Sequence, residues 1–218
     1  MHNQCSNILN SIANANLIIT PNSINMIKRY RYMDNKQYIT HRWGVNEIKS
    51  LVFNLNPIKK IFISGCISNF YPLRIIARKQ DKKLIEVLTH PSYKKLAHRI
   101  IGDNYIFELN KYLCCFCDGT SLNVILKKIY EILYSGSLLL SDLNIKNDLE
   151  EIGVIENVHC ILCDKNNIKN KMNYILNEEN IKEINDIRKN CFELEKTFTL
   201  DIHCNNINNS LKTYITTI

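Results

Sequence analysis

The sequence Cys117-Asp-Gly-Thr-Ser-Leu-Asn-Val-Ile-Leu-Lys-Lys-Ile-Tyr-Glu-Ile-Leu-Tyr-Ser-Gly-Ser-Leu-Leu-Leu-Ser-Asp142 contains, in order, a strand, a loop, a helix, a glycine stop and a second strand. The helix is expected over 122–134, because helical spacing there gives an apolar face of Ile125, Ile129, Ile132 and Leu133. The same spacing leaves Lys128, Glu131 and Ser135 on another stripe. Two apolar strands joined by an amphipathic helix predict a parallel βαβ unit.

The same alternation of apolar strands and amphipathic helices continues along the chain. We expect strands near 17–20, 60–64, 84–89, 112–117, 137–141 and 159–163, and further helices at 72–79, 93–101, 168–176 and 181–195. This predicts an α/β, Rossmann-like fold with a five- or six-stranded, mainly parallel sheet in 57–196 and helices on both faces. A break at Asn54-Leu-Asn-Pro57 separates residues 1–56 from residues 57–218.

Length and composition describe a globular protein with room for one substantial domain. The chain has 218 residues, of which 45% are hydrophobic and 22% charged, so it buries a core but does not accommodate two full Rossmann-like domains. Its longest apolar runs are too short to cross a bilayer, and we expect no transmembrane segment. Abundant Asn, Ile and Lys suggest an AT-rich genome, such as that of a large DNA virus or a protist.

The net charge is +7, from 28 Lys and Arg against 21 Asp and Glu. Such an excess suits a polyphosphate or nucleic-acid ligand. The basic residues are scattered, however, as the pairs Lys59-Lys60, Lys82-Lys83, Lys94-Lys95 and Lys127-Lys128. We therefore interpret them as a solvated basic surface and expect no nucleic-acid partner.

Cysteine usage points to a reducing compartment. The nine cysteines lie mostly in apolar runs such as Tyr112-Leu-Cys-Cys-Phe-Cys117, and no secretory signal precedes them. We expect a soluble, cytoplasmic protein, which for a viral protein means the host or viral-factory cytoplasm. Cys160 and Cys163 fall in an expected strand, where alternation points them to opposite faces, so no metal site is expected.

Basic residues follow the first strong strand, Ile61-Phe-Ile-Ser-Gly65. Gly65 allows the backbone to approach a phosphate, and the helix start after it offers free amide groups. Arg74, with Arg78 or Lys79 one helical turn further on, has the chemistry to hold a diphosphate. An ordinary solvated βα loop has the same composition, and from the residues alone both interpretations stay open.

His90 follows the next expected strand, in Thr89-His90-Pro91-Ser92-Tyr93. Ligands of open α/β sheets bind outside the carboxyl ends of the strands, which is where His90 would lie. A loop histidine without a ligand explains the sequence equally well. Glu131, judged by spacing alone, is a solvated helix residue.

Several of these segments together resemble the donor-binding domain of GT-B glycosyltransferases of the family 1/4 type, especially the spore-coat-protein-like branch. The matching motifs are Asp118-Gly119-Thr120, Lys128-Ile129-Tyr130-Glu131, Gly136 and the strand at 138–141. Upstream, Ile63-Ser-Gly65, Tyr71-Pro-Leu-Arg74 and His90-Pro-Ser-Tyr93 resemble the first two βα junctions of that branch. The resemblance runs from about Lys59 to the C-terminus.

The resemblance implies a nucleoside-diphosphate sugar of the UDP or GDP type as donor substrate, with no cofactor and no metal. The acceptor would be a hydroxyl of an unknown glycan, lipid or protein. Cations that stabilise the departing diphosphate are expected at Arg74, Lys79 and Lys128. Donor-binding residues are expected at Gly65, Arg78, His90, Asp118, Gly119, Thr120, Asn123 and Glu131, and Glu131 matches the family glutamate that holds the ribose hydroxyls.

The chain departs from the family in two places. Asn123 occupies the position of a second acidic residue of the family signature, and residues 1–56 match only the last part of an N-terminal domain, at Ala13-Asn-Ala-Asn-Leu-Ile-Ile-Thr-Pro21. The chain is therefore a split half whose N-terminal half is separate, a fragment, or a decayed enzyme. The alternative function is a non-catalytic nucleotide-binding or interaction module on the same fold.

Overall fold

The computed structural model describes residues 17–20, 37–41, 43–89, 100–196 and 199–217. A five-stranded sheet forms its centre, with strands β3 (Ile58–Gly65), β4 (Ile85–Thr89), β5 (Tyr112–Cys117), β6 (Leu138–Asp142) and β7 (Cys160–Cys163). The strand order is β4-β3-β5-β6-β7, and every pair is parallel. The predicted parallel α/β sheet is confirmed.

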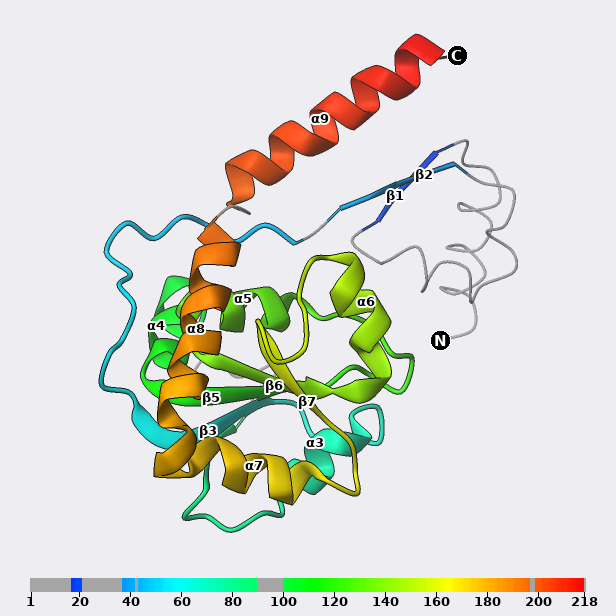
Figure 1. Ribbon diagram of the computed structural model, residues 1–218. Coiled ribbons are helices and arrows are strands. Elements are labelled where there is room, and N and C mark those ends of the chain that lie inside the picture. The colour runs from blue at the N-terminus through cyan, green and yellow to red at the C-terminus, as the bar shows by residue number, and fades with distance from the viewer. Residues whose placement is uncertain (1–16, 21–36, 42, 90–99, 197–198, 218) are drawn as a thin grey trace.

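Helices cover both faces of this sheet, as predicted. The described helices are α3 (Pro72–Ala77), α4 (Asp103–Asn110), α5 (Lys127–Ser135), α6 (Lys146–Glu151), α7 (Ile168–Leu176), α8 (Ile181–Lys196) and α9 (Leu200–Thr217), with short 3-10 turns at Leu143–Ile145 and Glu178–Asn180. Helices α4 and α5 lie on one face, and α3 and α7 lie on the other (Figure 1). Helix α9 extends away from the five-stranded sheet.

The core lies along the two central strands and the helix that joins them. All six residues of β5 and all five of β6 are buried, as expected for parallel strands that have helices on both sides. Helix α5 buries Ile129, Ile132 and Leu133 completely, each contributing roughly 1.5–3 kcal/mol of hydrophobic stabilisation. Gly136 ends the helix in the left-handed conformation with φ 76°, as a glycine stop predicts.

The strand order creates a topological switch point between β3 and β5. From β3 the chain moves outward to β4, and it then crosses back to β5 on the other side of β3. Helices α3 and α5, which follow these two neighbouring strands, consequently lie on opposite faces (Figure 1). The carboxyl ends of β3 and β5, at Gly65 and Cys117, thus border the crevice where ligands bind in open α/β sheets.

Helix α5 is shorter than predicted, because it begins at Lys127 rather than at residue 122. Thr120 Oγ1 accepts a hydrogen bond of 3.1 Å from the amide of Leu122, and Asn123 adopts the left-handed conformation with φ 53°. Local side-chain bonds of this kind compete with helix formation. The prediction of a helix over 122–126 was therefore wrong.

Other helix predictions had mixed outcomes. The expected helix at 93–101 lies outside the described residues except for Ile100 and Ile101, which are not helical. Helices α4, α6 and α9 were not predicted, and α3 ends at Ala77 instead of Lys79. The predicted helices at 168–176 and 181–195 are confirmed as α7 and α8.

The part of the chain before β3 forms a second, two-stranded parallel sheet of β1 (Leu17–Thr20) and β2 (Gln37–Thr40). Helix α9 contacts β2, and the amide of Leu200 donates a 3.0 Å hydrogen bond to the carbonyl oxygen of Val45. The connecting segment, residues 43–57, is anchored on helix α5, since the amide of Ile48 donates to the hydroxyl of Tyr134 at 2.7 Å. A domain boundary between residues 56 and 57 stays a prediction.

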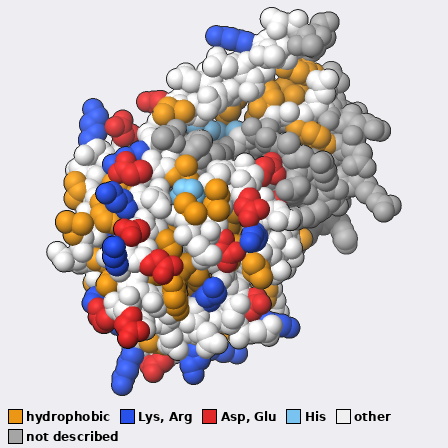
Figure 2. Space-filling model, viewed as in Figure 1, with side chains coloured by type: hydrophobic (Ala, Val, Ile, Leu, Met, Phe, Trp, Pro, Cys, Tyr) orange, Lys and Arg blue, Asp and Glu red, His pale blue; other side chains and the backbone are white. Residues whose placement is uncertain are grey.

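Charged side chains of both signs are interspersed on the face shown in Figure 2. This distribution agrees with the scattered basic pairs in the sequence. Among the described residues, no helix has both the length and the apolar character needed to cross a membrane.

Candidate functional site

Two cationic side chains converge on the glycine that ends β3. Gly65 has φ 105°, and a Cβ atom placed on it would lie 2.5 Å from Nζ of Lys128 and 2.8 Å from Nη1 of Arg74. The cations come from different elements, since Arg74 lies in α3 and Lys128 in α5. Only glycine allows both this backbone conformation and such a close approach. The result is a pair of positive groups at the switch point of the sheet.

Arg74 is held in place by the carboxylate of Asp118. Its Nη2 donates to Oδ1 of Asp118 at 2.6 Å, and its backbone amide donates to Oδ2 at 2.9 Å. Nη1 also donates to the carbonyl oxygen of Cys66 at 3.1 Å, and the guanidinium lies 4.0 Å from the ring centre of Tyr71. The arginine, only 2% exposed, is therefore fixed with one edge turned toward Gly65.

Asp118 supports the arginine from beneath rather than facing the crevice. It is fully buried, and burial raises the pKa of its carboxyl while the Arg74 guanidinium opposes that rise. Both oxygens accept hydrogen bonds from Arg74. This is a buried pair with two hydrogen bonds, the arrangement in which ion pairs are tolerated inside proteins.

Lys128 lies in the first turn of α5 and reaches back to the end of β3. Its Nζ donates to the carbonyl oxygen of Ser64 at 2.8 Å. Burial lowers the pKa of this ammonium, and so does Arg74, while Cys117, Asp118 and Glu131 raise it. The lysine is thus a desolvated cation with one anchoring bond and two remaining N–H donors.

Glu131 lies about one helical turn after Lys128, in the middle of α5. Its side chain is 19% exposed, and Oε1 lies 3.8 Å from Nζ of Lys127. Burial raises the pKa of its carboxyl, and Lys127 and Lys128 oppose the rise. Glu131 is thus a largely desolvated carboxyl rather than a freely solvated one.

Glu131 and Arg74 belong to helices α5 and α3, which lie on opposite faces of the sheet, and both act on the thiol of Cys117 at the end of β5. Burial raises the pKa of the Cys117 thiol to about 11, Lys128 and Arg74 act to lower it, and Glu131 acts to raise it. One thiol at the end of β5 is therefore within electrostatic reach of all three groups.

Two further predicted residues, Gly119 and Thr120, lie in the loop that follows β5. Gly119 is buried, and a Cβ atom on it would lie 2.6 Å from Cγ2 of Ile145. Thr120, also buried, turns the chain, and the next amide, that of Ser121, donates to the carbonyl oxygen of Phe70 at 2.8 Å. The loops after β3 and β5 are therefore tied together around Arg74.

Asn123, Arg78 and Lys79 are more exposed than the buried residues beside Gly65. Asn123 is half-buried in the turn before α5. Arg78 is half-buried just after α3, and burial lowers the pKa of its guanidinium, helped by Arg74. Lys79 is exposed beyond the end of the same helix. His90 lies outside the described residues, so its prediction is left as it stands.

Two residues of the site were missed by sequence reasoning. Oγ of Ser64 lies 2.6 Å from the hydroxyl oxygen of Tyr105, which belongs to α4. Burial raises the pKa of Tyr105 well above its usual range. The available signal was the spacing of Tyr105 and Leu109, one helical turn apart, on a helix that begins at Asp103. The prediction placed a helix at 93–101 instead.

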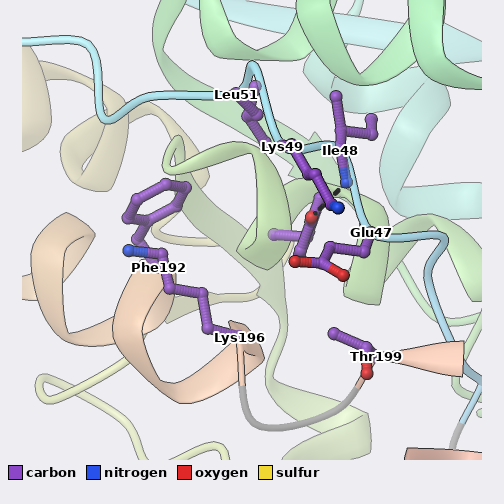
Figure 3. A pocket seen from close by; sticks show the side chains of 8 residues that line it. Glu47, Ile48, Lys49, Leu51, Phe192, Lys196 and Thr199 are labelled. Atoms are coloured by element: carbon purple, nitrogen blue, oxygen red, sulfur yellow. Dashed lines mark hydrogen bonds between the residues drawn. The ribbon is translucent and has the colours of Figure 1, made fainter. Parts of the chain in front are cut away.

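A separate pocket of about 340 Å³ lies between the connecting segment, α5 and α8 (Figure 3). Glu47, Lys49 and Leu51 of the segment face Phe192 and Lys196 of α8 across it, and the other lining residues are Ile48, Tyr134 and Thr199. None of the predicted site residues lines this pocket. Within the described ranges, no group of three or more His, Cys, Asp or Glu side chains is arranged to hold a metal ion.

Comparisons with known proteins are informative at the level of structure. No protein family and no curated protein matches the sequence. The fold is similar to the pneumococcal O-GlcNAc transferase GtfA, solved in complex with UDP and GlcNAc, with a TM-score of 0.56 and 11% identity over 97% of this chain and 47% of that one. It is similarly related to the GtfA/B complex, with a TM-score of 0.56 and 10% identity over 97% and 48%.

These similarities establish the fold and not the activity. The chain spans about half the length of the solved structures that it matches. It has the α/β fold of GT-B glycosyltransferases, at a sequence identity too low to transfer a reaction.

Proposed function

We propose that this chain is the donor-binding half of a glycosyltransferase that moves a sugar from a nucleoside diphosphate to an acceptor hydroxyl. The observation that carries the proposal is the convergence of Arg74 Nη1 and Lys128 Nζ on Gly65. A diphosphate is the ligand class that best matches two desolvated cations beside an open backbone at the switch point of a parallel sheet. The UDP bound to the structural neighbour GtfA supports this ligand class.

In the proposed reaction the bond between the anomeric carbon and the diphosphate oxygen breaks, and the diphosphate leaves with the electron pair. The acceptor oxygen forms the new bond to the anomeric carbon, and its proton passes to an oxygen of the departing diphosphate. Negative charge therefore grows on the diphosphate, and positive groups already in place stabilise it without reorganisation. Arg74 and Lys128 supply this stabilisation, and the more distant Arg78 and Lys79 add to the positive field.

Glu131 has a different role in the proposal, as the acceptor for the ribose hydroxyls. A carboxylate takes hydrogen bonds from both hydroxyls of a vicinal diol. Its place one turn after Lys128 suits a ribose attached to a diphosphate held at Gly65. Thr120, Asn123 and His90 stay proposed donor contacts.

The acceptor site is proposed to lie outside this chain. The chain spans about half the length of its structural neighbours, so the acceptor platform is assigned to a region other than the described residues. The eight described cysteines are free thiols, which favours a reducing compartment such as the cytoplasm.

Titration calorimetry of the full chain with UDP, GDP and the matching nucleotide sugars tests the proposal. Lys128→Met is expected to weaken binding about ten- to a hundredfold, because hydrogen bonds to charged groups contribute about 1.5–3 kcal/mol. The control is Lys111→Met, since this lysine is exposed and precedes β5 at the opposite end of the sheet. Absence of nucleotide binding by the wild type, or equal loss in both variants, contradicts the proposal.

A second candidate function is nucleotide binding without transfer. It is favoured by Asn123, which carries no charge at a position where the resemblance has an acidic residue. In that case UDP binds through Lys128 and Glu131, but neither hydrolysis nor transfer of the sugar occurs. Release of UDP from nucleotide sugars, measured with and without candidate acceptor proteins, distinguishes the two functions.

A further inference from the structure

Ser64, near the end of β3, forms hydrogen bonds with residues of two helices, α4 and α5. Its hydroxyl pairs with Tyr105 of α4 at 2.6 Å, and its carbonyl oxygen accepts from Lys128 of α5 at 2.8 Å. Ser64 itself is 4% exposed and directly precedes Gly65. Three elements, β3, α4 and α5, are thus joined at one residue next to the cation pair.

We propose that the hydroxyl pair of Ser64 and Tyr105 positions the ammonium of Lys128. It fixes the end of β3, and with it the carbonyl oxygen that keeps Nζ over Gly65. This inference rests on the proposed function, because it assigns Tyr105 as a positioning residue for the same diphosphate site. Tyr105 acts through Ser64 and not on the ligand itself.

Two observations support a positioning role for the Ser64–Tyr105 pair. A buried hydroxyl that loses its partner is left with an unsatisfied polar group, so the Ser64–Tyr105 bond resists displacement of the strand end. The charge of Lys128 also depends on its hydrogen bond to the Ser64 carbonyl oxygen. Burial lowers the pKa of the ammonium, and a hydrogen bond to the charged form raises it. Loosening the carbonyl should therefore make Lys128 easier to deprotonate.

The titration of Lys128 depends on charges from every element around it. The groups that act on it are Arg74 from α3, Cys117 from β5, Asp118 after β5 and Glu131 from α5. Tyr105 from α4 reaches it through Ser64. Burial raises the pKa of the Tyr105 hydroxyl well above its usual range, whereas burial lowers the pKa of the Lys128 ammonium. A change caused by Tyr105→Phe is consequently not a loss of tyrosinate charge.

The direct test is the titration of Lys128 in the ligand-free full chain, followed by NMR with ¹³Cε-labelled lysine. The Lys128 signal is assigned by its disappearance in Lys128→Arg. We expect Tyr105→Phe and Ser64→Ala each to lower the titration midpoint of Lys128. The double variant should match the single variants, because all three remove the same hydrogen bond.

Tyr174→Phe is the matched control, because Tyr174 of α7 donates a 2.6 Å hydrogen bond to Glu183 on the exposed surface. It should leave the Lys128 midpoint unchanged. With UDP as probe at about pH 9, affinity should fall on the order of three- to tenfold in Tyr105→Phe and Ser64→Ala. In the Lys128→Arg background, where the cation does not deprotonate, this alkaline loss should disappear.

An unchanged Lys128 midpoint in Tyr105→Phe and Ser64→Ala overturns the inference, even if the melting temperature falls. If Tyr105→Phe does not fold, Ser64→Ala alone decides, because it removes one oxygen and keeps the tyrosine ring. If the wild type binds no nucleoside diphosphate, the proposed function fails while the NMR titration still tests the positioning role.

Discussion

Asp118 accepts two hydrogen bonds from the same residue, one from Nη2 of Arg74 at 2.6 Å and one from its backbone amide at 2.9 Å. One carboxylate thereby fixes both the arginine side chain and the first turn of α3. The carboxylate and the guanidinium are almost completely buried. Removing one partner of such a pair leaves the other charge uncompensated in the interior.

Asp118→Asn should therefore destabilise the protein by about 3–5 kcal/mol. Urea denaturation followed by circular dichroism measures this loss. Glu178→Gln is the control, because it breaks an exposed ion pair with Lys59, and such pairs contribute at most about 1 kcal/mol. Equal stability of Asp118→Asn and wild type would show that the buried pair contributes no net stabilisation.

Gly65→Ala should impair both stability and nucleotide binding. The added methyl group would meet Lys128 Nζ and Arg74 Nη1 in a backbone conformation with φ 105°. Gly153→Ala is a matched control, since Gly153 has φ 81° but nothing within 4 Å of the added atom. Both variants should lose about 1–3 kcal/mol of stability from backbone strain, and calorimetry with UDP should show reduced affinity only for Gly65→Ala.

Glu131→Ala should weaken UDP or GDP binding about ten- to a hundredfold, because ribose hydroxyls lose charge-assisted bonds of roughly 1.5–3 kcal/mol. Calorimetry on wild type and variant measures the change. A dissociation constant that stays the same for a nucleotide bound by the wild type would identify Glu131 as a helix residue without contact to the ligand.

Glu131→Gln should change nucleotide binding and the stability of the protein in opposite directions. Burial raises the pKa of the Glu131 carboxyl, so stability is lost as the pH rises from the pKa of the unfolded glutamate through this raised value. The amide does not ionise, and Glu131→Gln should be more stable than wild type near pH 7 while binding nucleotide more weakly. Below the pKa of the unfolded glutamate both proteins carry a neutral group, so the stability difference should vanish. Thermal denaturation from about pH 4 to pH 8 measures it.

Arg188→Met should loosen the connecting segment. The fully buried guanidinium of Arg188 donates to the carbonyl oxygens of Gly136 at 3.0 Å and Asn54 at 2.9 Å, and to Asn185 at 2.6 Å. Leaving these acceptors without donors should cost about 2–4 kcal/mol. Limited proteolysis near Asn54, compared with Lys189→Met on the same helix, checks the prediction. Equal cleavage in both variants would contradict it.

The sequence by itself determined the sheet and most of its helices. Continuous apolar runs such as 112–117 and 138–141 have one stable environment, a parallel strand covered on both faces, and both are confirmed as β5 and β6. Local chemistry also fixed the end of α5, because Gly136 alone among nearby residues takes the left-handed conformation without a steric cost. The residues Gly65, Arg74 and Lys128 were identified from motifs that lie far apart in the chain.

Only the tertiary structure decided which of these polar side chains contact one another and which are buried. Asp118 was expected at the donor, yet it is fully buried beneath Arg74, a contact between residues 44 positions apart that no local pattern encodes. Tyr105 enters the site through Ser64 because α4 and α5 cover the same face of the sheet, which is a consequence of the strand order. The turn that shortened α5 depends on Thr120 and Asn123 competing with the helix for backbone groups. Periodicity records which side chains are apolar, whereas long-range packing determines which polar groups meet.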